Sequence, residues 1–184
     1  MGSKEDIMEA TFRALSEYGY ADLSIQNIAD ESEKAKSAIY YHFDDREDLL
    51  LSFMDFLQEN LEGIHADLES EGMEKLDELI DIALGIEDDE RWMVHRALLD
   101  LRAQAPRNES FAEKFREIDS AIIKNVEEVM KDIGAEEPEI AAEMFVSTVD
   151  GAVSRKVSTG DREGLETLRE GIKRIVRDYQ CDGN

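Results

Sequence analysis

The amino-acid sequence predicts an all-α protein with a small N-terminal helical head and a larger helical body. Apolar residues recur at intervals of three and four along nearly the whole chain, which is the spacing of one face of a helix. The 184 residues include only two prolines, Pro106 and Pro138, and no alternating apolar run long enough for a strand. We therefore expect about nine helices, three short ones followed by about six longer ones.

The first three helices and their ends follow from capping residues and glycine. The first helix is expected over residues 4–18, and Gly19 is expected to end it. Its predicted buried residues are Ile7, Met8, Thr11, Phe12 and Leu15. Ser24 is expected to cap the second helix, because its hydroxyl can accept a hydrogen bond from a backbone N–H of the first turn. Ile25 and Ile28 would then point inward.

Residues 24–43 have the pattern of a helix-turn-helix, with a turn near residues 31–34. A small residue, Ala29, stands where the two helices would cross, and an apolar residue, Ile39, stands ten positions later where it can anchor the second helix. The second helix of this motif enters the major groove of DNA. One of the two tyrosines, Tyr40 or Tyr41, is expected to lie partly in the core.

The residues expected to contact DNA lie on or next to this second helix. Lysines near its start reach phosphate or a guanine edge, and small residues permit close approach. Tyrosine and histidine rings combine an apolar body with a polar tip. Residues 32–46 carry three acids and three bases, so this segment is neutral in a chain of net charge −24. The expected contacts are Lys34, Lys36, Ser37, Ala38, Tyr40, Tyr41, His42 and Arg46.

The remaining helices are marked by glycine and proline. Asp44 and Asp45 can cap a long fourth helix. Its apolar positions are Leu50, Phe53, Leu57, Leu61, Ile64 and Leu68. Later helices are predicted over residues 73–84, 89–104, 109–133, 137–158 and 161–179. The expected domains are therefore a DNA-binding head at residues 1–45 and a body at residues 46–184.

The composition is typical of a folded, soluble protein whose surface carries many acidic side chains. Forty-five acids oppose 21 bases, and the acids are spread evenly from Glu5 to Asp182. Near 1 M salt the Debye length falls to about 3 Å, which screens the resulting repulsion. The sequence therefore favours a halophilic host, and an acidic protein of an ordinary host is the alternative. No apolar run approaches the roughly 18 residues that cross a bilayer, and no secretory signal is visible, so we expect a cytoplasmic location without membrane association.

Residues 10–50 closely resemble the DNA-binding head of the tetracycline-repressor (TetR) family. In that family a helix that ends in a glycine turn precedes Ser/Thr-x-x-x-Ile-Ala, a turn, and a helix that ends in Leu-Tyr-x-His-Phe. Here Ile39-Tyr40-Tyr41-His42-Phe43 stands at the end of that helix, and Asp45-Arg46-Glu47-Asp48-Leu49 stands at the start of the fourth helix. Where the family usually has Gly-Val-Ser in the turn, this chain has Glu33-Lys34-Ala35, which lacks the glycine and the serine cap.

The resemblance implies a homodimer that binds double-stranded DNA at a pseudo-palindromic operator and leaves it when a small molecule binds the body. Ser24 joins the expected DNA contacts on this ground, and the last two helices would form the dimer interface. Apolar stripes such as those on the last two helices more often belong to an ordinary hydrophobic core. The resemblance to the family favours a dimer interface instead. The expected function is a ligand-responsive transcriptional regulator, most simply a repressor.

Aromatic residues of the middle helices are candidates for an effector pocket, since small-molecule sites are mostly apolar with a few polar groups. A hydrophobic or amphipathic effector is expected between the fourth and seventh helices. The candidate residues are Phe53, Phe56, Leu57, His65, Trp92, His95, Phe111 and Phe115. Most aromatics at helical spacing are simply core, and that alternative stays open.

The sequence offers no sign of an enzyme, a cofactor or a metal centre. His42, His65 and His95 are far apart, no paired metal-ligand spacing occurs, and there is no glycine-rich phosphate loop. The single cysteine, Cys181, cannot form an intramolecular disulfide. The alternative function is a helical interaction or scaffold protein that has a repressor-like head without operator binding.

Overall fold

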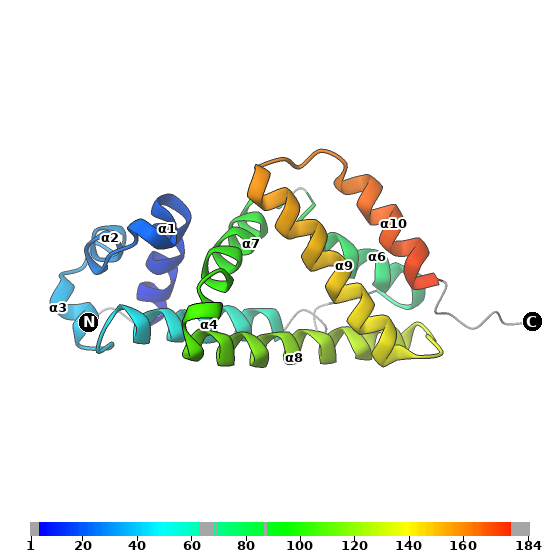
Figure 1. Cartoon of the computed structure of the whole chain (residues 1–184), viewed down its shortest axis with the longest axis horizontal. Helices are drawn as coiled ribbons and strands as arrows, with labels where there is room; N and C mark the ends of the chain where they lie inside the picture. Colours follow the sequence, from blue (N-terminus) through cyan, green and yellow to red (C-terminus); the bar gives the residue numbers. More distant parts are fainter. Residues whose placement is uncertain (1–3, 63–67, 69, 87, 178–184) are drawn as a thin grey trace, which may run out of the picture. The chain divides into compact units, whose positions relative to one another are not determined.

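The helices of this chain fall into two groups that each pack around their own core. A computed structural model describes residues 4–62, 68, 70–86 and 88–177. This part of the chain contains nine α-helices, one 3-10 helix and no β-strand, which confirms the all-α prediction (Figure 1). The first unit comprises Met1–Asn60 and Arg96–Arg116, and the second comprises Leu61–His95 and Glu117–Asn184.

The first unit begins with three helices: α1 (Lys4–Asp22), α2 (Ile25–Glu31) and α3 (Lys36–Tyr40). Helix α1 packs against α2, and α2 packs against α3. Gly19 interrupts α1 with φ 69° and ψ 169°, a conformation that suits glycine, and one further turn follows it. The predicted stop at Gly19 is therefore a kink, and the helix ends at Asp22.

Nearly all residues that are predicted to form the core of these helices are buried in the structure. Ile7, Met8 and Leu15 are buried, and the buried Thr11 hydroxyl donates to the Ile7 carbonyl over 2.7 Å. Phe12 is only half-buried and stacks on Phe53. The other buried side chains are Ala10, Ala14, Leu23, Ile25, Ile28, Ala29, Ile39 and Phe43. Ala29 and Ile39 therefore take the crossing and anchoring positions that the helix-turn-helix pattern predicts.

Helix α4 (Arg46–Glu62) starts at the predicted aspartate cap, where the Asp48 N–H donates to Asp45 Oδ1 over 2.9 Å. It is shorter than predicted. Leu50, Phe53 and Leu57 are buried on it, whereas the buried Leu68 lies beyond its end and belongs to the second core. Of the other two predicted positions, the side chain of Leu61 and the whole of Ile64 lie outside the described residues.

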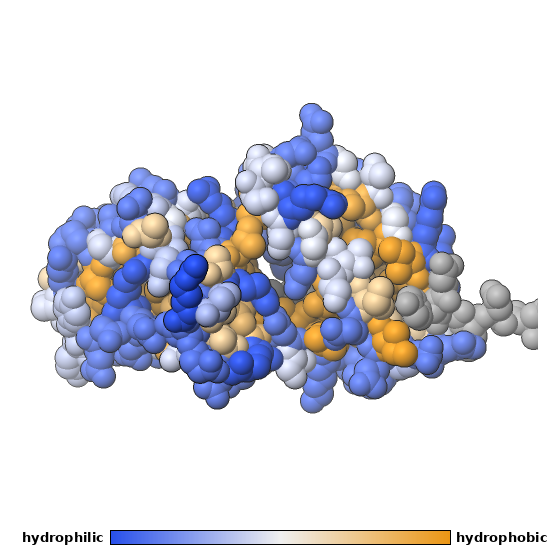
Figure 2. Space-filling model, viewed as in Figure 1, coloured by the Kyte–Doolittle hydropathy of each residue, from blue (hydrophilic) through white to orange (hydrophobic). Residues whose placement is uncertain are grey.

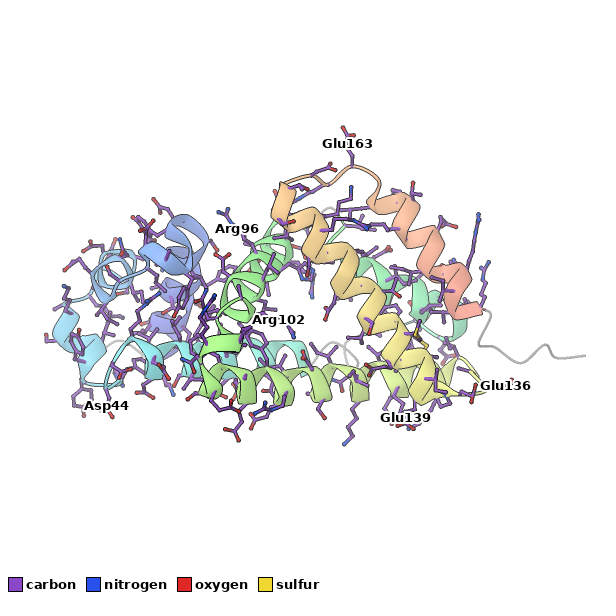
Figure 3. All side chains as sticks on the ribbon, viewed as in Figure 1. Asp44, Arg96, Arg102, Glu136, Glu139 and Glu163 are labelled. Atoms are coloured by element: carbon purple, nitrogen blue, oxygen red, sulfur yellow. The ribbon has the colours of Figure 1, made fainter. Side chains whose placement is uncertain are left out.

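Helix α7 (Asp89–Arg102), the 3-10 helix η1 (Ala105–Arg107) and helix α8 (Glu109–Asp132) follow one another in the chain. The predicted helix over residues 89–104 is thus two residues shorter, because Pro106 begins a separate turn. The Asn108 side chain caps α8 by accepting the Phe111 N–H over 3.1 Å. Both α7 and α8 contribute residues to each unit. In the first unit, the Arg102 guanidinium lies 4.4 Å from the ring centroid of Phe115 (Figure 3).

The second unit is built around α6 (Gly72–Leu84), α9 (Pro138–Thr159) and α10 (Leu165–Arg177). Helix α10 packs against both α6 and α9. The core residues of these three helices come from positions three and four apart, as helical packing requires. Residues of α8 complete this core, including Val126, Val129 and Met130.

Ion pairs join α10 to α6 along one side of the second core. Arg169 is bonded to both carboxylate oxygens of Asp81, and Lys173 is bonded to Asp77. The hydrogen bonds that Arg169 donates to the Asp81 carboxylate raise the pKa of Arg169. Bidentate arginine–carboxylate pairs also fix orientation, so these contacts set the register of α10 on α6.

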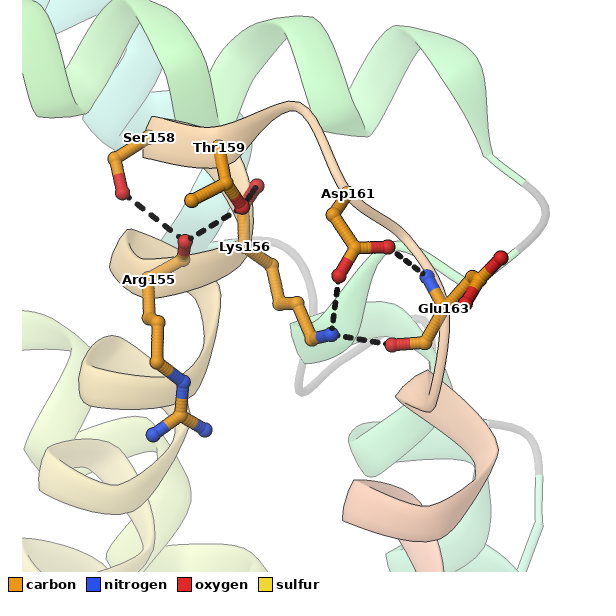
Figure 4. A network of polar contacts seen from close by, with 6 residues as sticks. All are labelled: Arg155, Lys156, Ser158, Thr159, Asp161 and Glu163. Atoms are coloured by element: carbon orange, nitrogen blue, oxygen red, sulfur yellow. Dashed lines mark hydrogen bonds and ion pairs between the residues drawn. The ribbon is translucent and has the colours of Figure 1, made fainter.

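The loop between α9 and α10 is a defined turn and not the first turn of a helix (Figure 4). Lys156 lies 3.0 Å from Asp161 and also donates to the Glu163 carbonyl, while the Glu163 N–H donates to Asp161 over 2.7 Å. Gly164 then adopts φ 78°. The predicted start of the last helix at residue 161 is therefore wrong, and α10 starts at Leu165.

Candidate nucleic-acid interface

The exposed face of α3 and the turn after it carries most of the predicted DNA contacts. Lys36, Ser37 and His42 are exposed, and Ala38 is half-exposed. Tyr40 is 55% exposed and Tyr41 is 72% exposed. The prediction that one of these tyrosines lies partly in the core is wrong, because Ile39 and Phe43 already anchor this helix in the core.

The aromatic side chains of this face pack on one another at its edge. The Tyr41 and His42 rings meet edge to face with centroids 5.1 Å apart and an interplanar angle of 87°. His42 lies 6.2 Å from the buried Phe43 ring. Edge-to-face packing holds each ring in place while the phenol and imidazole tips remain available for hydrogen bonds. The face therefore presents apolar rings with polar tips, which suits contact with phosphate oxygens.

The cations of this region differ sharply in their surroundings. Lys36 is exposed and has no ion pair or hydrogen bond with any residue that the structure describes. Lys34 is paired with Asp6 of α1 over 2.8 Å. Arg46 donates to the Tyr20 carbonyl, and its guanidinium lies 4.3 Å from the Tyr20 ring centroid. Two of the three predicted cationic contacts thus have partners within the head.

Ser24 also has a partner within the head. Its Oγ accepts the Asn27 N–H over 3.2 Å, and Asn27 Oδ1 accepts the Ser24 N–H over 2.9 Å. This reciprocal capping box confirms the predicted start of α2. A role for Ser24 at DNA stays a prediction.

The turn between α2 and α3 keeps a left-handed residue although it lacks glycine. Glu33 has φ 53°, the sole non-glycine residue with positive φ in the described chain. The turn is closed by the Lys34 N–H, which donates to the Ala29 carbonyl over 3.1 Å. Ala35 caps α3 without any side-chain hydrogen bond. The backbone therefore takes up the strain that glycine would avoid, and the recognition helix lacks one cap.

Acidic side chains flank the recognition face. Asp44 lies between α3 and α4 (Figure 3), and its carboxylate forms no ion pair with any of the described residues. The other exposed acids near this face are Asp30, Glu33, Asp45, Glu47 and Asp48. Hydrophilic residues also cover most of the surface visible in Figure 2. The face is thus a neutral and aromatic patch within an acidic surface.

The candidate effector residues are divided between the two units. Phe53, Leu57, Phe111 and Phe115 are buried in the first unit, and Phe53 stacks on the half-buried Phe56. Trp92 and His95 belong to the second unit, and the Arg162 guanidinium lies 4.6 Å from the Trp92 ring centroid. His65 lies outside the described residues. An effector role for any of these residues stays a prediction.

His95 is the polar candidate with the most unusual surroundings. Its ring packs on Gly85 at the end of α6, where a Cβ would meet His95 Cδ2 at 3.5 Å. Its buried Nε2 has no hydrogen-bond partner within the described chain. Burial, helped by the nearby positive charge of Arg91, lowers the pKa of His95 to about 4. The imidazole is therefore neutral at neutral pH.

The described residues hold no group of three or more histidine, cysteine, aspartate or glutamate side chains placed to bind a metal ion. None of the helices described is both long and apolar enough to cross a membrane.

Sequence reasoning missed Asp6 and Tyr20, which hold Lys34 and Arg46. Asp6 lies 28 residues from Lys34, and Tyr20 lies 26 residues from Arg46, so no local spacing connects either pair. The available signal at Tyr20 was its position directly after the glycine that ends the main part of α1.

Comparison with known proteins places both segments of the chain in one family. Residues 7–53 match the bacterial regulatory proteins of the tetR family, and residues 70–179 match the tetracyclin repressor-like C-terminal domain. A curated relative, the HTH-type transcriptional repressor AcnR of Corynebacterium glutamicum, is 26% identical over 95% of this chain and 93% of its own length.

Solved structures agree with this placement. A TetR transcription regulator from Haloarcula marismortui is 34% identical, covers 96% of this chain and 97% of its own, and superposes with a TM-score of 0.84. The regulator FadR from Bacillus subtilis, solved in complex with stearoyl-CoA, is 22% identical over 95% and 97% of the two chains, with a TM-score of 0.71. The chain belongs to the TetR family and is a DNA-binding transcription regulator.

Proposed function

We propose that this protein is a homodimeric repressor that binds a pseudo-palindromic operator through α3 and leaves it when a small molecule binds the body. The exposed face formed by Lys36, Ser37, Tyr40, Tyr41 and His42 is the observation that carries this proposal. A face with two exposed tyrosines next to a lysine without a partner suits a ligand rich in phosphate. Its position on the second helix of a helix-turn-helix suits the major groove.

The proposed dimer interface lies on α9 and α10. Ile140 is 47% exposed and Met144 is 44% exposed, one helical turn apart on α9, and Ile175 of α10 is 39% exposed. Gly151 and Gly171 lie inside these helices, and a Cβ at either position would meet nothing within 4 Å. A glycine inside a helix lowers helix stability by about 1 kcal/mol relative to alanine, and close approach of a second backbone is a reason to keep it.

A two-fold dimer would set the distance between the two α3 helices. Successive major-groove faces on one side of DNA recur every 34 to 36 Å or so, and binding requires the two helices to match this repeat or a multiple of it. An effector that binds more tightly to a conformation with another separation would shift the equilibrium away from DNA. The domain division at residues 45 and 46 and the cytoplasmic location both stay predictions.

A hydrophobic or amphipathic molecule is the proposed effector. The proposed contacts for such a ligand are the buried aromatic and aliphatic side chains of α4 and α8 in the first unit. FadR has the same fold and was solved in complex with stearoyl-CoA, a ligand with a long acyl chain, and this supports the proposal. A thermal-shift screen of fatty acids, acyl-CoAs and amphipathic cations is the direct search for the effector.

The net charge of −24 supports a halophilic host. The similarity to a regulator from Haloarcula marismortui is in line with that proposal. In about 1 M salt the charges of the acidic side chains are screened. The repulsion between the acids near α3 and the DNA phosphates is therefore weaker. Binding experiments therefore belong in concentrated potassium chloride.

A protein-interaction role without operator binding is the second candidate. It is favoured by the pairing of Lys34 and Arg46 within the head and by the acids around α3. Selection of random DNA by the purified protein, in about 1 M KCl, separates the two candidates. Enrichment of a short inverted repeat supports the repressor. Enrichment of no sequence by a folded dimer supports the interaction protein.

A further inference from the structure

We propose that Tyr20 is a positioning residue that couples the start of α8 to the DNA-binding helices, with Arg46 as its partner on α4. The inference rests on the proposed function, because it describes how the body can influence DNA binding. It gives Arg46 a role inside the head in addition to any contact with phosphate.

Tyr20 contacts the first residue of α4 through both its ring and its backbone. The Arg46 guanidinium carbon lies 4.3 Å from the Tyr20 ring centroid, and Arg46 Nη2 donates to the Tyr20 carbonyl. Stacking and hydrogen bonding together fix the plane of the guanidinium. Tyr20 directly follows the kink at Gly19, so the path of α1 determines where the ring stands.

Another part of the same ring contacts α8. The Tyr20 and Phe111 rings meet edge to face, with centroids 6.4 Å apart and an interplanar angle of 80°. Phe111 is fully buried near the start of α8. Edge-to-face pairs are directional, so a rotation of Phe111 changes the position in which the Tyr20 ring is most stable. One ring therefore links Phe111 of α8 to Arg46, the first residue of α4.

Arg46 lies close to the recognition helix along the chain. Helix α3 ends at Tyr40 and α4 starts at Arg46, and the buried Phe43 fixes the connection between them. The Phe43 N–H also donates to the Ile39 carbonyl over 3.0 Å. A displacement of Arg46 at the start of α4 therefore moves the end of α3, where Tyr40 and Tyr41 are exposed.

The contact also has the property of a switch. Arg46 Nε is buried and has no hydrogen-bond partner among the described residues. A buried donor without a partner destabilises the arrangement that encloses it. If the Tyr20 ring moves aside, water can reach Nε of Arg46. The new hydrogen bond to water then partly offsets the loss of stacking between the guanidinium and the ring. Two arrangements of similar free energy are the requirement for a conformational change that a ligand can bias.

The test compares variants of the full-length protein on DNA that the wild-type protein has selected. Tyr20→Leu removes the aromatic ring, Tyr20→Phe keeps it, and Arg46→Lys keeps the charge but removes the stacking plane. We expect Tyr20→Leu and Arg46→Lys to change the affinity for the selected DNA by about fivefold or more. The affinity of Tyr20→Phe should stay within about twofold of the wild-type value.

Ile118→Val is the control for Phe111→Leu. Ile118 is as buried as Phe111 and lies two turns further along α8, but it carries no aromatic ring. Both variants are expected to lower the melting temperature by similar amounts, and only Phe111→Leu is expected to change DNA affinity. The effects of Phe111→Leu and Arg46→Lys should be non-additive, and this coupling should vanish when Tyr20 is leucine.

Two outcomes would overturn the inference. If Arg46→Lys and Tyr20→Leu are folded and bind the selected DNA as the wild-type protein does, Tyr20 has no positioning role although the protein is a regulator. If Ile118→Val changes affinity as much as Phe111→Leu, the effects follow stability alone. Failure of the wild-type protein to select any DNA would be seen before any variant is made, and it would overturn the proposed function together with this inference.

Discussion

The Lys34 ammonium lies 2.8 Å from a carboxylate oxygen of Asp6, so a cation of the helix-turn-helix turn is paired with α1. Of the three cations that the sequence predicts at DNA, Lys36 alone has no partner in the described chain. A phosphate that approaches Lys34 must compete with Asp6 for the same ammonium group. The intramolecular pair therefore lowers the affinity that this lysine can contribute.

Asp6→Asn is expected to raise the affinity for the selected DNA by about two- to fivefold, because it frees Lys34 and removes a negative charge near the turn. Glu5→Gln is the control, since it removes the same charge from the exposed side of the same helix. Fluorescence anisotropy with labelled DNA measures both. Equal effects of the two variants would show that net charge, and not the Lys34 pair, sets the affinity.

Glu33→Gly is expected to raise the free energy of unfolding by about 0.5–1 kcal/mol. Glu33 has φ 53°, where a Cβ is strained and glycine is not. Glu33→Ala removes the same charge but keeps the Cβ, so it serves as the control and should show little gain. Urea unfolding at neutral pH gives both values. A gain of the same size for alanine would attribute the effect to charge.

His95 is expected to make the protein less stable in mild acid. Its pKa is lowered to about 4 in the folded chain, against about 6.5 in the unfolded chain. The unfolded state therefore binds a proton first as the pH falls. The contribution of His95 to stability is complete above pH 6.5 or so and is lost progressively between about pH 6.5 and 4, by roughly 2–3 kcal/mol.

The measurement for His95 is urea unfolding of the wild-type protein and of His95→Gln between pH 7 and pH 5. Glutamine does not titrate, so the difference between the two proteins isolates the histidine from the many carboxylates. We expect the wild-type protein to lose stability relative to the variant as the pH falls. A constant difference over this range would mean that the folded protein accommodates the imidazolium ion.

Potassium chloride is expected to stabilise the protein. From 0.1 M to 1 M salt the Debye length falls from about 10 Å to about 3 Å, which screens the repulsion of a chain with net charge −24. Salt also weakens ion pairs such as Arg162–Asp89, but exposed pairs contribute only about 0–1 kcal/mol each. Repulsion is the larger effect, and we expect urea unfolding to show a higher free energy of unfolding at 1 M than at 0.1 M salt. A loss of stability over this range would contradict the halophilic interpretation.

Local patterns were sufficient to predict the elements of the head. Ser24 caps α2, Ala29 sits at the helix crossing, and Ile39 anchors α3, because each of these roles depends on residues a few positions apart. The helical periodicity also predicted α6 and α8 to within a residue at each end. Hydrophobic spacing and capping are properties of a single helix, so they can be read without a fold.

The errors arose where side-chain contacts and tertiary packing, and not helical periodicity, decide the local structure. The start of α10 is delayed because Lys156 and Asp161 fold residues 161–164 into a turn. The exposure of Tyr40 and Tyr41 follows from the space that Ile39 and Phe43 already occupy in the core. Lys34 and Arg46 have intramolecular partners that only the packing of α1 brings near. Spacing along the chain holds no information on the last two contacts, which join residues 28 and 26 positions apart.

We expect α3 to read a DNA sequence, and this is tested by comparing selective binding by the wild-type protein with that of Tyr41→Ala and Lys36→Ala. The side chains of Tyr41 and Lys36 are exposed, so neither substitution should disturb the core. In about 1 M KCl, anisotropy titrations would use the selected fragment and a shuffled fragment of the same composition.

We expect the wild-type protein to bind the selected fragment more than about 100-fold tighter than the shuffled one. Each variant should lose at least about tenfold on the selected fragment, while its melting temperature stays unchanged. Equal binding of the two fragments by the wild-type protein, or unchanged selective binding by both variants, would contradict the assignment of α3 as the reading helix.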